Sequence, residues 1–129
     1  KKPETFDFLG FTFYCGKGKK SGNFCVKLKT NRKKFQQKLK ATKEWLYENR
    51  TMPVKEMISK LNLKLIGHYK YYGVSHNSAK IGAFLHFIQR YLYKVLNRRS
   101  HKRSYTWDGY IEMLKVYPLA KPKIYVKLF

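Results

Sequence analysis

Three successive stretches between residues 31 and 99 carry apolar side chains three or four positions apart, the spacing of one face of an α-helix. Only short connections join these stretches, so three neighbouring helices can bury their apolar faces against one another. We therefore predict a small three-helix bundle over residues 31–99. The apolar positions are Phe35, Leu39, Thr42 and Leu46 in the first stretch, Val54, Ile58, Leu61, Leu65, Tyr69 and Tyr72 in the second, and Ile81, Leu85, Ile88, Leu92 and Val95 in the third.

Residues that favour helix ends stand beside these stretches. Asn31 or Thr30 can cap the first helix, because each offers a side-chain oxygen to the free N–H groups of the first turn. Pro53 suits the first turn of the second helix, and Gly73 is well placed to end it. Ser78 is the predicted cap of the third helix.

The first 30 residues have the composition of β-strands. Residues 6–14 are almost all aromatic or β-prone, and residues 24–29 alternate apolar side chains with lysine. A glycine-rich, cationic loop over residues 15–23 joins them, so we predict a β-hairpin over residues 1–30. Gly10 inside the first strand indicates a bulge or a close backbone approach. Residues 6–9 read like an interior strand with nothing before it, as if the chain began inside a longer protein.

The last 30 residues form a third segment, 100–129. Residues 98–104 are predicted to be a flexible basic linker. Thr106 can cap a short helix that Pro118 stops, residues 118–123 are extended by their prolines, and residues 124–129 alternate like a final strand. The predicted fold is mainly α: an N-terminal β-hairpin, a three-helix bundle, a basic linker, a short helix and an extended tail.

The charge of the chain requires an anionic partner. Lysine and arginine total 29 and aspartate and glutamate total 7 in 129 residues, a formal charge of +22. The positive charges repel one another, and binding to a polyanion relieves this repulsion. The chain is not simply disordered, because 43% of its residues are apolar and can form a core. Lysine outnumbers arginine 23 to 6, which favours contacts with a nucleic-acid backbone over reading of bases.

No catalytic site can be assembled from the sequence. The seven acidic residues are scattered, and Glu44 and Glu48 are most simply surface ion-pair partners among lysines. The four histidines show no metal-ligand spacing, and His68 is either a packed histidine or an RNA contact. Cys15 and Cys25 could face each other across the hairpin, but reduced, partly buried thiols are the simpler interpretation. The thiols and the lack of a signal peptide or an apolar run of membrane-spanning length favour a reducing, cytoplasmic compartment.

Basic side chains form stripes beside the apolar ones. On the first predicted helix, Gln36, Lys40, Lys43, Tyr47 and Arg50 share a face, where lysines can meet phosphates along one groove. Tyr71 lies off the apolar stripe of the second helix and is a candidate for stacking on a base. The full set of predicted RNA-binding residues is Lys17, Lys19, Lys20, Lys40, Lys43, Arg50, Lys60, Lys64, Tyr71, Arg98, Arg99, Lys102 and Arg103.

Three stretches resemble the C-terminal part of group II intron reverse transcriptases, in the same order. Residues 6–13, with the core Phe-Leu-Gly-Phe, resemble the strands that close the palm, and residues 58–73 look like the maturase thumb signature, domain X. Residues 105–124 are similar to the segment that follows the thumb in bacterial members. His68 stands where the family often has Trp, and no Tyr-Ala-Asp-Asp-type metal site or zinc-binding endonuclease segment is present.

The resemblance implies an RNA-binding thumb and maturase module. Its partners would be group II intron RNA, a template–primer duplex and the palm and fingers of the same protein, in a bacterial cytoplasm. Leu9, Gly10 and Phe11 would be primer-grip positions. The resemblance implies no cofactor in this chain, since Mg²⁺ is expected only in the absent palm. Without catalytic residues of its own, the chain would assist splicing and reverse transcription by gripping RNA.

Two alternatives remain from the residues alone. A ribosomal-protein-like structural component of a ribonucleoprotein would have the same composition, although the Phe-Leu-Gly-Phe hairpin speaks against it. A binder of anionic membranes is disfavoured by the even spread of lysines and the capped, globular helices.

Overall fold

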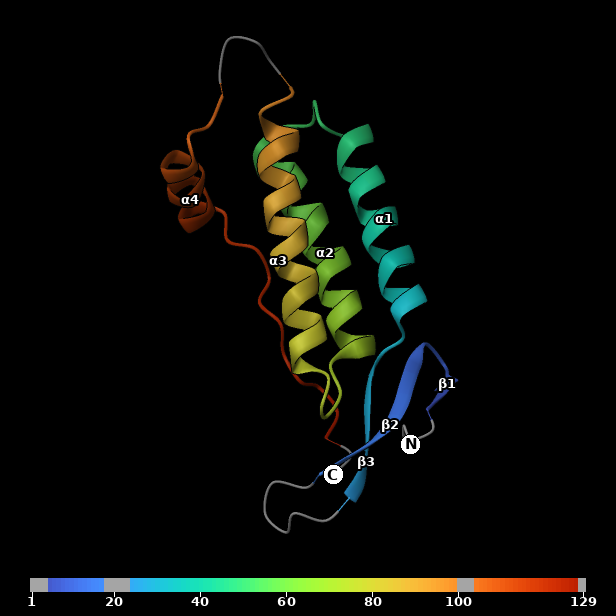
Figure 1. The fold of residues 1–129 in the computed structure, drawn as a ribbon. Coiled ribbons are helices and arrows are strands. Elements are labelled where there is room, and N and C mark those ends of the chain that lie inside the picture. The colour runs from blue at the N-terminus through green and yellow to red at the C-terminus, as the bar shows by residue number, and fades with distance from the viewer. Residues whose placement is uncertain (1–4, 18–23, 100–103, 128–129) are drawn as a thin grey trace.

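The computed structural model describes residues 5–17, 24–99 and 104–127. In this part of the chain a small antiparallel sheet is followed by four helices (Figure 1), so the predicted, mainly helical fold with an N-terminal β-element is confirmed. None of the described helices is both long and apolar enough to cross a membrane. The elements are β1 (Phe6–Phe8), β2 (Phe11–Lys17), β3 (Phe24–Thr30), α1 (Arg32–Glu48), α2 (Val54–Tyr72), α3 (Ser78–Leu96) and α4 (Trp107–Val116).

The sheet has the strand order β1-β2-β3, with both pairs antiparallel. The prediction of one strand over residues 6–14 was wrong, because the chain reverses at Leu9 and Gly10, where φ is +52° and +85°. Two successive positive φ values are typical of the tight turns that join hairpin strands. The predicted close approach at Gly10 is confirmed, since a Cβ on this residue would lie 2.9 Å from the Tyr72 hydroxyl.

Cys15 lies opposite Val26 in the β2–β3 register and carries a free, exposed thiol. The disulfide that the sequence left open is therefore absent at Cys15, and the prediction of a partly buried thiol is wrong for this residue. The strand alternation turns the Cys15 side chain to the open face of the sheet.

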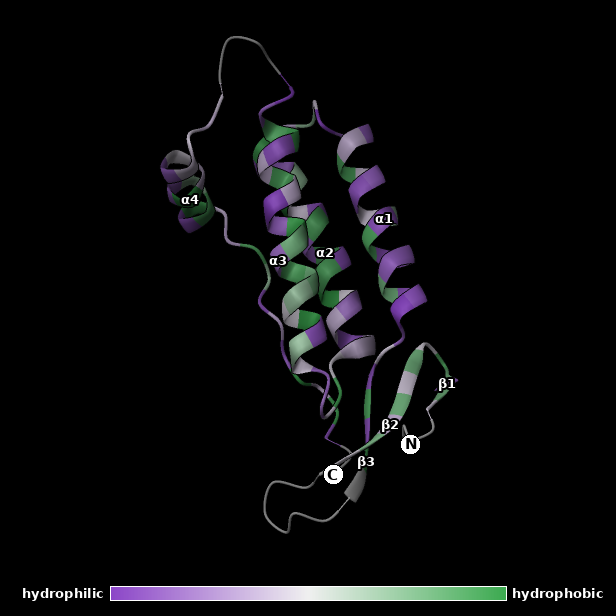
Figure 2. Cartoon of the chain, in the orientation of Figure 1, coloured by the Kyte–Doolittle hydropathy of each residue, from purple (hydrophilic) through white to green (hydrophobic). Residues whose placement is uncertain are grey.

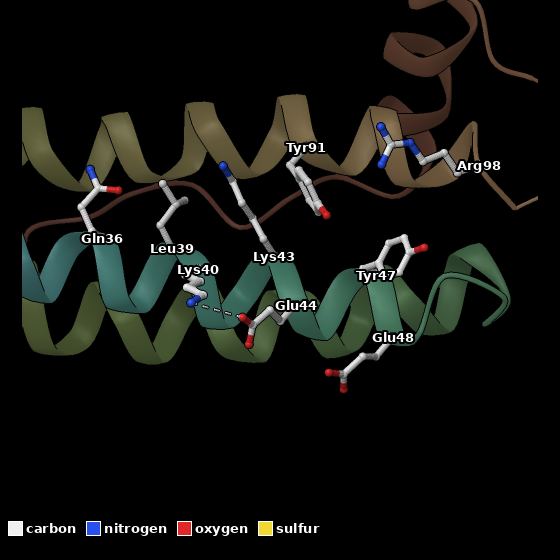
Figure 3. A pocket seen from close by; sticks show the side chains of 9 residues that line it. All are labelled: Gln36, Leu39, Lys40, Lys43, Glu44, Tyr47, Glu48, Tyr91 and Arg98. Carbon is white, nitrogen blue, oxygen red and sulfur yellow. Dashed lines mark ion pairs between the residues drawn. The ribbon is translucent and has the colours of Figure 1, made fainter.

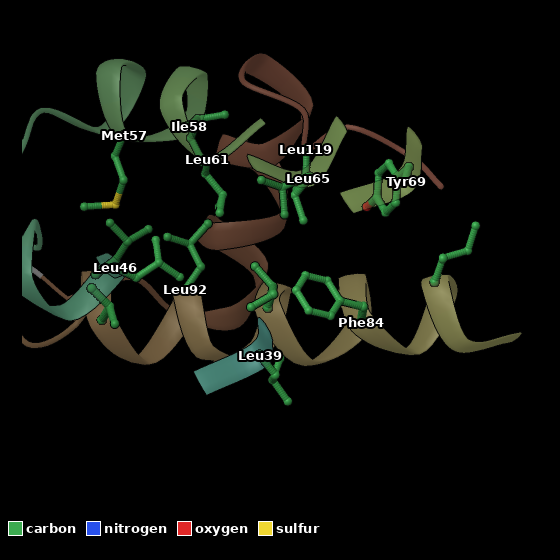
Figure 4. Close-up of a cluster of buried hydrophobic side chains, with 14 of the residues drawn as sticks. Leu39, Leu46, Met57, Ile58, Leu61, Leu65, Tyr69, Phe84, Leu92 and Leu119 are labelled. Atoms are coloured by element: carbon green, nitrogen blue, oxygen red, sulfur yellow. The ribbon is translucent and has the colours of Figure 1, made fainter. Parts of the chain in front are cut away.

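The core lies between α1, α2 and α3 (Figure 4), and most of the predicted apolar stripes contribute to it. Thr42, Val54 and Leu85 are only half-buried, because they lie at the margins of the helix contacts. Figure 2 shows the complementary pattern, with hydrophilic residues over much of α1. The buried residues of the three helices are Phe35, Leu39, Leu46, Met57, Ile58, Leu61, Leu65, His68, Tyr69, Tyr72, Ile81, Phe84, Ile88, Leu92, Val95 and Leu96.

The predicted N-cap residue is confirmed for α1 but not for α3. Asn31 caps α1 by accepting a 3.0 Å hydrogen bond from the N–H of Lys34. The N-cap of α3 is Asn77, and Ser78 is the first helical residue, so the predicted cap was wrong. The fully buried Asn77 side chain is used for a tertiary connection instead, because it accepts from the N–H of Thr30 and donates to Thr30 Oγ1 and to the carbonyl of Tyr72, each at 2.8 Å.

The C-terminal segment returns along the bundle toward the sheet (Figure 1). Thr106 caps α4 as predicted, accepting a 3.1 Å hydrogen bond from the N–H of Gly109. The predicted final strand over residues 124–129 was wrong where the structure describes it, because only a single parallel bridge joins Val126 to Val74. Residues 128 and 129 lie outside the described part of the chain.

Candidate nucleic-acid interface

A groove of about 500 Å³ lies between α1 and α3 (Figure 3). Three of the residues predicted to contact RNA, Lys40, Lys43 and Arg98, line it together, although Arg98 comes 55 positions after Lys43. We call it the α1–α3 groove. The remaining lining residues are Gln36, Leu39, Glu44, Tyr47, Glu48 and Tyr91.

Aromatic rings and cations are paired along this groove. The Nζ atom of Lys43 lies 5.4 Å from the centroid of the Tyr91 ring. The guanidinium carbon of Arg50 lies 4.3 Å from the centroid of the Tyr47 ring, and the Tyr47 side chain is exposed. Rings that are exposed beside cations can stack with bases while the cations meet phosphates.

Two carboxylates, Glu44 and Glu48, reduce the positive electrostatic potential of the α1–α3 groove. Glu44 lies 3.9 Å from Lys40, and both side chains are largely exposed, so this ion pair contributes little stability. The ion-pair interpretation of Glu44 is confirmed. Three cations against two carboxylates leave the lining with a net charge of 3 − 2 = +1.

A second groove, of about 770 Å³, opens between α1 and α2 beside the β1–β2 turn. We call it the α1–α2 groove. It brings together four of the residues predicted to contact nucleic acid, Leu9, Gly10, Lys64 and Tyr71. Its lining contains three lysines and no carboxylate, so it is the more strongly positive of the two. The other lining residues are Lys34, Lys38, Ala41, Thr42, Leu63, Gly67, His68, Tyr72 and Phe84.

Lys34 and Lys38 are the basic residues of this groove that the sequence analysis missed. They stand four positions apart on α1, a spacing that places both on one face of the helix. That spacing was visible in the sequence. Lys64 lines the same groove because α2 packs against α1, and this packing cannot be predicted from the spacing of residues within α1.

Two of the predicted primer-grip residues, Leu9 and Gly10, line the α1–α2 groove, and the third, Phe11, packs against Tyr71. The Tyr71 hydroxyl donates a hydrogen bond to the carbonyl oxygen of Leu9, and the Phe11 ring stacks parallel to Tyr71 with a centroid distance of 5.8 Å. One face of the Tyr71 ring is therefore covered by Phe11. The side chain is still 52% exposed, which leaves surface for another ring.

His68 forms part of the floor of the α1–α2 groove and is a packed histidine, one of the two alternatives open from the sequence. Its ring is 8% exposed and stacks on Phe84 with a centroid distance of 3.8 Å. Burial, and to a lesser degree the positive charge of Lys38, lower the pKa of His68 to about 4. The imidazole is therefore neutral at pH 7, and among the described residues its Nε2 atom has no hydrogen-bond partner.

The remaining predicted RNA contacts do not join either groove. Lys60 forms a 3.2 Å ion pair with Glu56, and Arg99 donates a 3.0 Å hydrogen bond to the carbonyl of Met52. The side chain of Lys17 and the whole of Lys19, Lys20, Lys102 and Arg103 lie outside the described part of the chain.

Metal-ligating side chains are not gathered anywhere in residues 5–17, 24–99 and 104–127. No three His, Cys, Asp or Glu side chains there lie close enough together to hold a metal ion. The expectation that Mg²⁺ belongs to a palm outside this chain stays a prediction.

The fold and its two basic grooves define a small helical domain, preceded by an antiparallel sheet, with a strongly cationic α1 face. Residues 32–110, from the start of α1 into α4, match the family described as "Group II intron, maturase-specific domain". The match covers more than half of the chain, and the chain belongs to this family, as the sequence resemblance indicated. Neither a curated protein nor a solved structure matches the chain significantly.

Proposed function

We propose that this maturase-specific domain binds group II intron RNA with α1 as the central element of the interface. The observation that carries the proposal is that α1 supplies lysines to both grooves. Lys40 and Lys43 line one groove, and Lys34 and Lys38 line the other. A continuous cationic helix between two hollows can follow the phosphate backbone of a folded RNA.

The chemistry of these contacts favours backbone over sequence recognition. Lysine ammonium groups act as point charges and lack the planar fork with which arginine recognises a base edge. Each phosphate neutralised by a lysine releases counterions, so affinity falls steeply as the salt concentration rises. With about six phosphate contacts, we expect log K to fall with log salt at a slope of about −4 to −5.

We infer wider roles from the family. In a longer protein that supplies a palm and fingers, the same face would hold a template–primer duplex, with the turn at Leu9 and Gly10 near the primer end. The chain would then support reverse transcription and splicing by positioning nucleic acid. The free thiol of Cys15 suits a reducing compartment such as the bacterial cytoplasm.

The test compares binding of the 129-residue chain to a folded group II intron RNA and to an unrelated structured RNA of equal length, across a salt series. We expect the intron RNA to be preferred near physiological salt. The double variant Lys40→Glu and Lys43→Glu should lose at least tenfold in affinity, because reversing two charges makes the α1–α3 groove more negative by four units.

The matched control is Lys115→Glu with Lys121→Glu, which makes the same change of charge at exposed positions outside both grooves. Its affinity should stay within about threefold of the unmodified chain, and both variants should keep the thermal melt nearly unchanged. Equal losses in the two doubles would show that total charge, and not the α1 face, determines binding. Equal affinity for the two RNAs would place selectivity elsewhere in the intron-encoded protein.

A further inference from the structure

The α1–α2 groove combines two kinds of surface that a phosphate backbone alone does not need together. Three lysines line it, and so do three of the most exposed large apolar side chains of the described residues. Leu9 is 67% exposed, Leu63 is 71% exposed and Tyr71 is 52% exposed. Exposed apolar side chains gathered in one hollow indicate a binding site, whereas isolated ones are ordinary.

Gly67 keeps the floor of this groove open. It stands in the middle of α2, where glycine costs about 1 kcal/mol relative to alanine. A Cβ added at Gly67 would meet no atom within 4 Å, so no packing contact among the described residues requires glycine there. The backbone of α2 is therefore accessible from the groove at this one turn.

Next to Gly67, the floor is aromatic and uncharged. The stacked rings of His68 and Phe84 lie under the groove, and the His68 ring carries no charge at pH 7. The Nε2 atom of His68 is buried beneath this floor and has no hydrogen-bond partner among the described residues. Because both rings are buried, they contribute no charge to the floor of the groove, and a neutral floor with a cationic rim is complementary to a nucleobase with its flanking phosphates.

We propose that the α1–α2 groove holds a single unpaired nucleotide of the bound RNA. Its base lies over Gly67 against Leu63 and Tyr71, and Lys34, Lys38 and Lys64 neutralise the phosphates on either side. This inference rests on the proposed function and deepens it, because it names the part of the RNA that this groove takes. A base inside a continuous duplex is stacked on both faces and cannot present its apolar surface to the groove, whereas a bulged or looped base can.

The test uses three RNA hairpins that differ at one position. In the first all bases are paired, in the second one adenosine is bulged, and in the third the bulged position is abasic. The abasic bulge keeps the flexibility of the backbone and removes only the base. We expect the 129-residue chain to bind the bulged adenosine roughly tenfold more tightly than either of the other two hairpins, measured by fluorescence anisotropy.

Gly67→Leu should abolish this preference, because the new side chain occupies the space of the base. Gly82→Leu is the matched control: Gly82 is also inside a helix and a Cβ there also meets nothing within 4 Å, but it lines neither groove. A second pair is Leu63→Gln, expected to weaken the preference at least threefold, and Val116→Gln, an equally exposed apolar residue on α4 that should not. Thermal melts verify that all four variants are folded.

The proposal is overturned if the unmodified chain binds the three hairpins equally, or if Gly67→Leu keeps the preference for the bulged adenosine. Either result leaves the proposed function standing, provided that the intron RNA is bound. Failure to bind the intron RNA and all three hairpins would overturn the proposed function, and this inference with it.

Discussion

The hydroxyl group of Tyr71, near the end of α2, donates a 2.5 Å hydrogen bond to the carbonyl oxygen of Leu9, 62 residues earlier in the chain. Phe11 stacks on the same tyrosine ring, so the β1–β2 turn is held against the helix by one polar and one aromatic contact. The turn and the α1–α2 groove therefore form one structural unit. A displacement of α2 would move the predicted primer-grip residues with it.

Replacing Tyr71 by Phe tests the polar half of this connection. The ring and its stacking on Phe11 remain, while the hydrogen bond to Leu9 is lost. We expect a loss of about 1 kcal/mol in the free energy of unfolding, measured by urea denaturation, with faster amide exchange at residues 9–12. Tyr47→Phe is the control, because Tyr47 is also exposed and no described residue bonds to its hydroxyl. A Tyr71→Phe variant as stable as Tyr47→Phe, with unchanged exchange, would contradict the prediction.

Gly73 is the position at which we expect the most sensitive response to an added methyl group. The backbone φ is −78°, which any residue adopts, so the requirement for glycine comes from space. A Cβ there would collide with the carbonyl oxygens of Tyr69 and Lys123, and these are backbone atoms that cannot rotate away. The carbonyl of Gly73 also accepts from the N–H groups of Tyr125 and Val126, which docks the C-terminal segment.

Gly73→Ala should therefore destabilise the chain by about 2 kcal/mol or more, measured by thermal or denaturant unfolding. Gly82→Ala should change stability in the opposite direction, by up to about 1 kcal/mol, because it improves helix propensity in open space. If both variants were stabilised, the docking of the C-terminal segment against Gly73 would be wrong.

Because the pKa of His68 is lowered in the folded chain, we expect the free energy of unfolding to decrease in acid. Its pKa is about 4 in the folded chain and 6.5 in the unfolded chain, so between these values the unfolded chain binds a proton that the folded chain does not. Stability is therefore complete above pH 6.5 and falls as the pH drops toward 4. The contribution lost over this window is on the order of 2 kcal/mol.

The measurement is the free energy of unfolding at pH 7 and pH 4.5 for the unmodified chain and for His68→Phe. Phenylalanine keeps a ring on Phe84 and removes the titrating group together with the unpaired Nε2 atom. The difference between the two pH values should shrink by roughly 2 kcal/mol in His68→Phe and should be unchanged in His86→Gln, which alters an exposed histidine. Parallel pH profiles for all three proteins would assign the acid sensitivity to other groups.

Lys60 and Lys64 lie one turn apart on α2, and the sequence assigned both to RNA. The structure separates them: Lys64 lines the α1–α2 groove with its Nζ 5.0 Å from the centroid of the Trp45 ring, whereas Lys60 is paired with Glu56 outside it. We expect Lys64→Gln to reduce the salt slope of RNA binding by about 1 and Lys60→Gln to leave it nearly unchanged. The reverse order would mean that the RNA passes along the other side of α2.

Local rules explain which parts of the molecule were predictable. The helical stripes, the cap at Asn31 and the cap at Thr106 each depend on residues within about one turn of one another. Such interactions are written in the sequence, because helix geometry fixes the distance between neighbouring side chains. The same holds for the stripe that brings Lys40, Lys43 and Tyr47 to one face.

The features that were missed depend on contacts between distant segments. Leu9 takes a left-handed conformation that is unfavourable for a residue with a Cβ, and Tyr71 and Tyr72 hold the turn in place. Asn77 replaces Ser78 as the cap of α3 because its side chain is bound to Thr30 and Tyr72. These partners lie far away in the sequence, so rules that consider only neighbouring residues cannot predict them.

By itself, the sequence determined a strongly basic bundle of three amphipathic helices and its membership of the maturase-specific family. Charge and apolar periodicity are properties of each segment and survive any arrangement of the segments. Only the tertiary structure decided which cations share a groove. Because α1 packs against two different helices, Lys34 and Lys38 line one groove together with Lys64, and Lys43 lines the other together with Arg98. Helix packing sets those distances, and it results from the fit of the whole buried core.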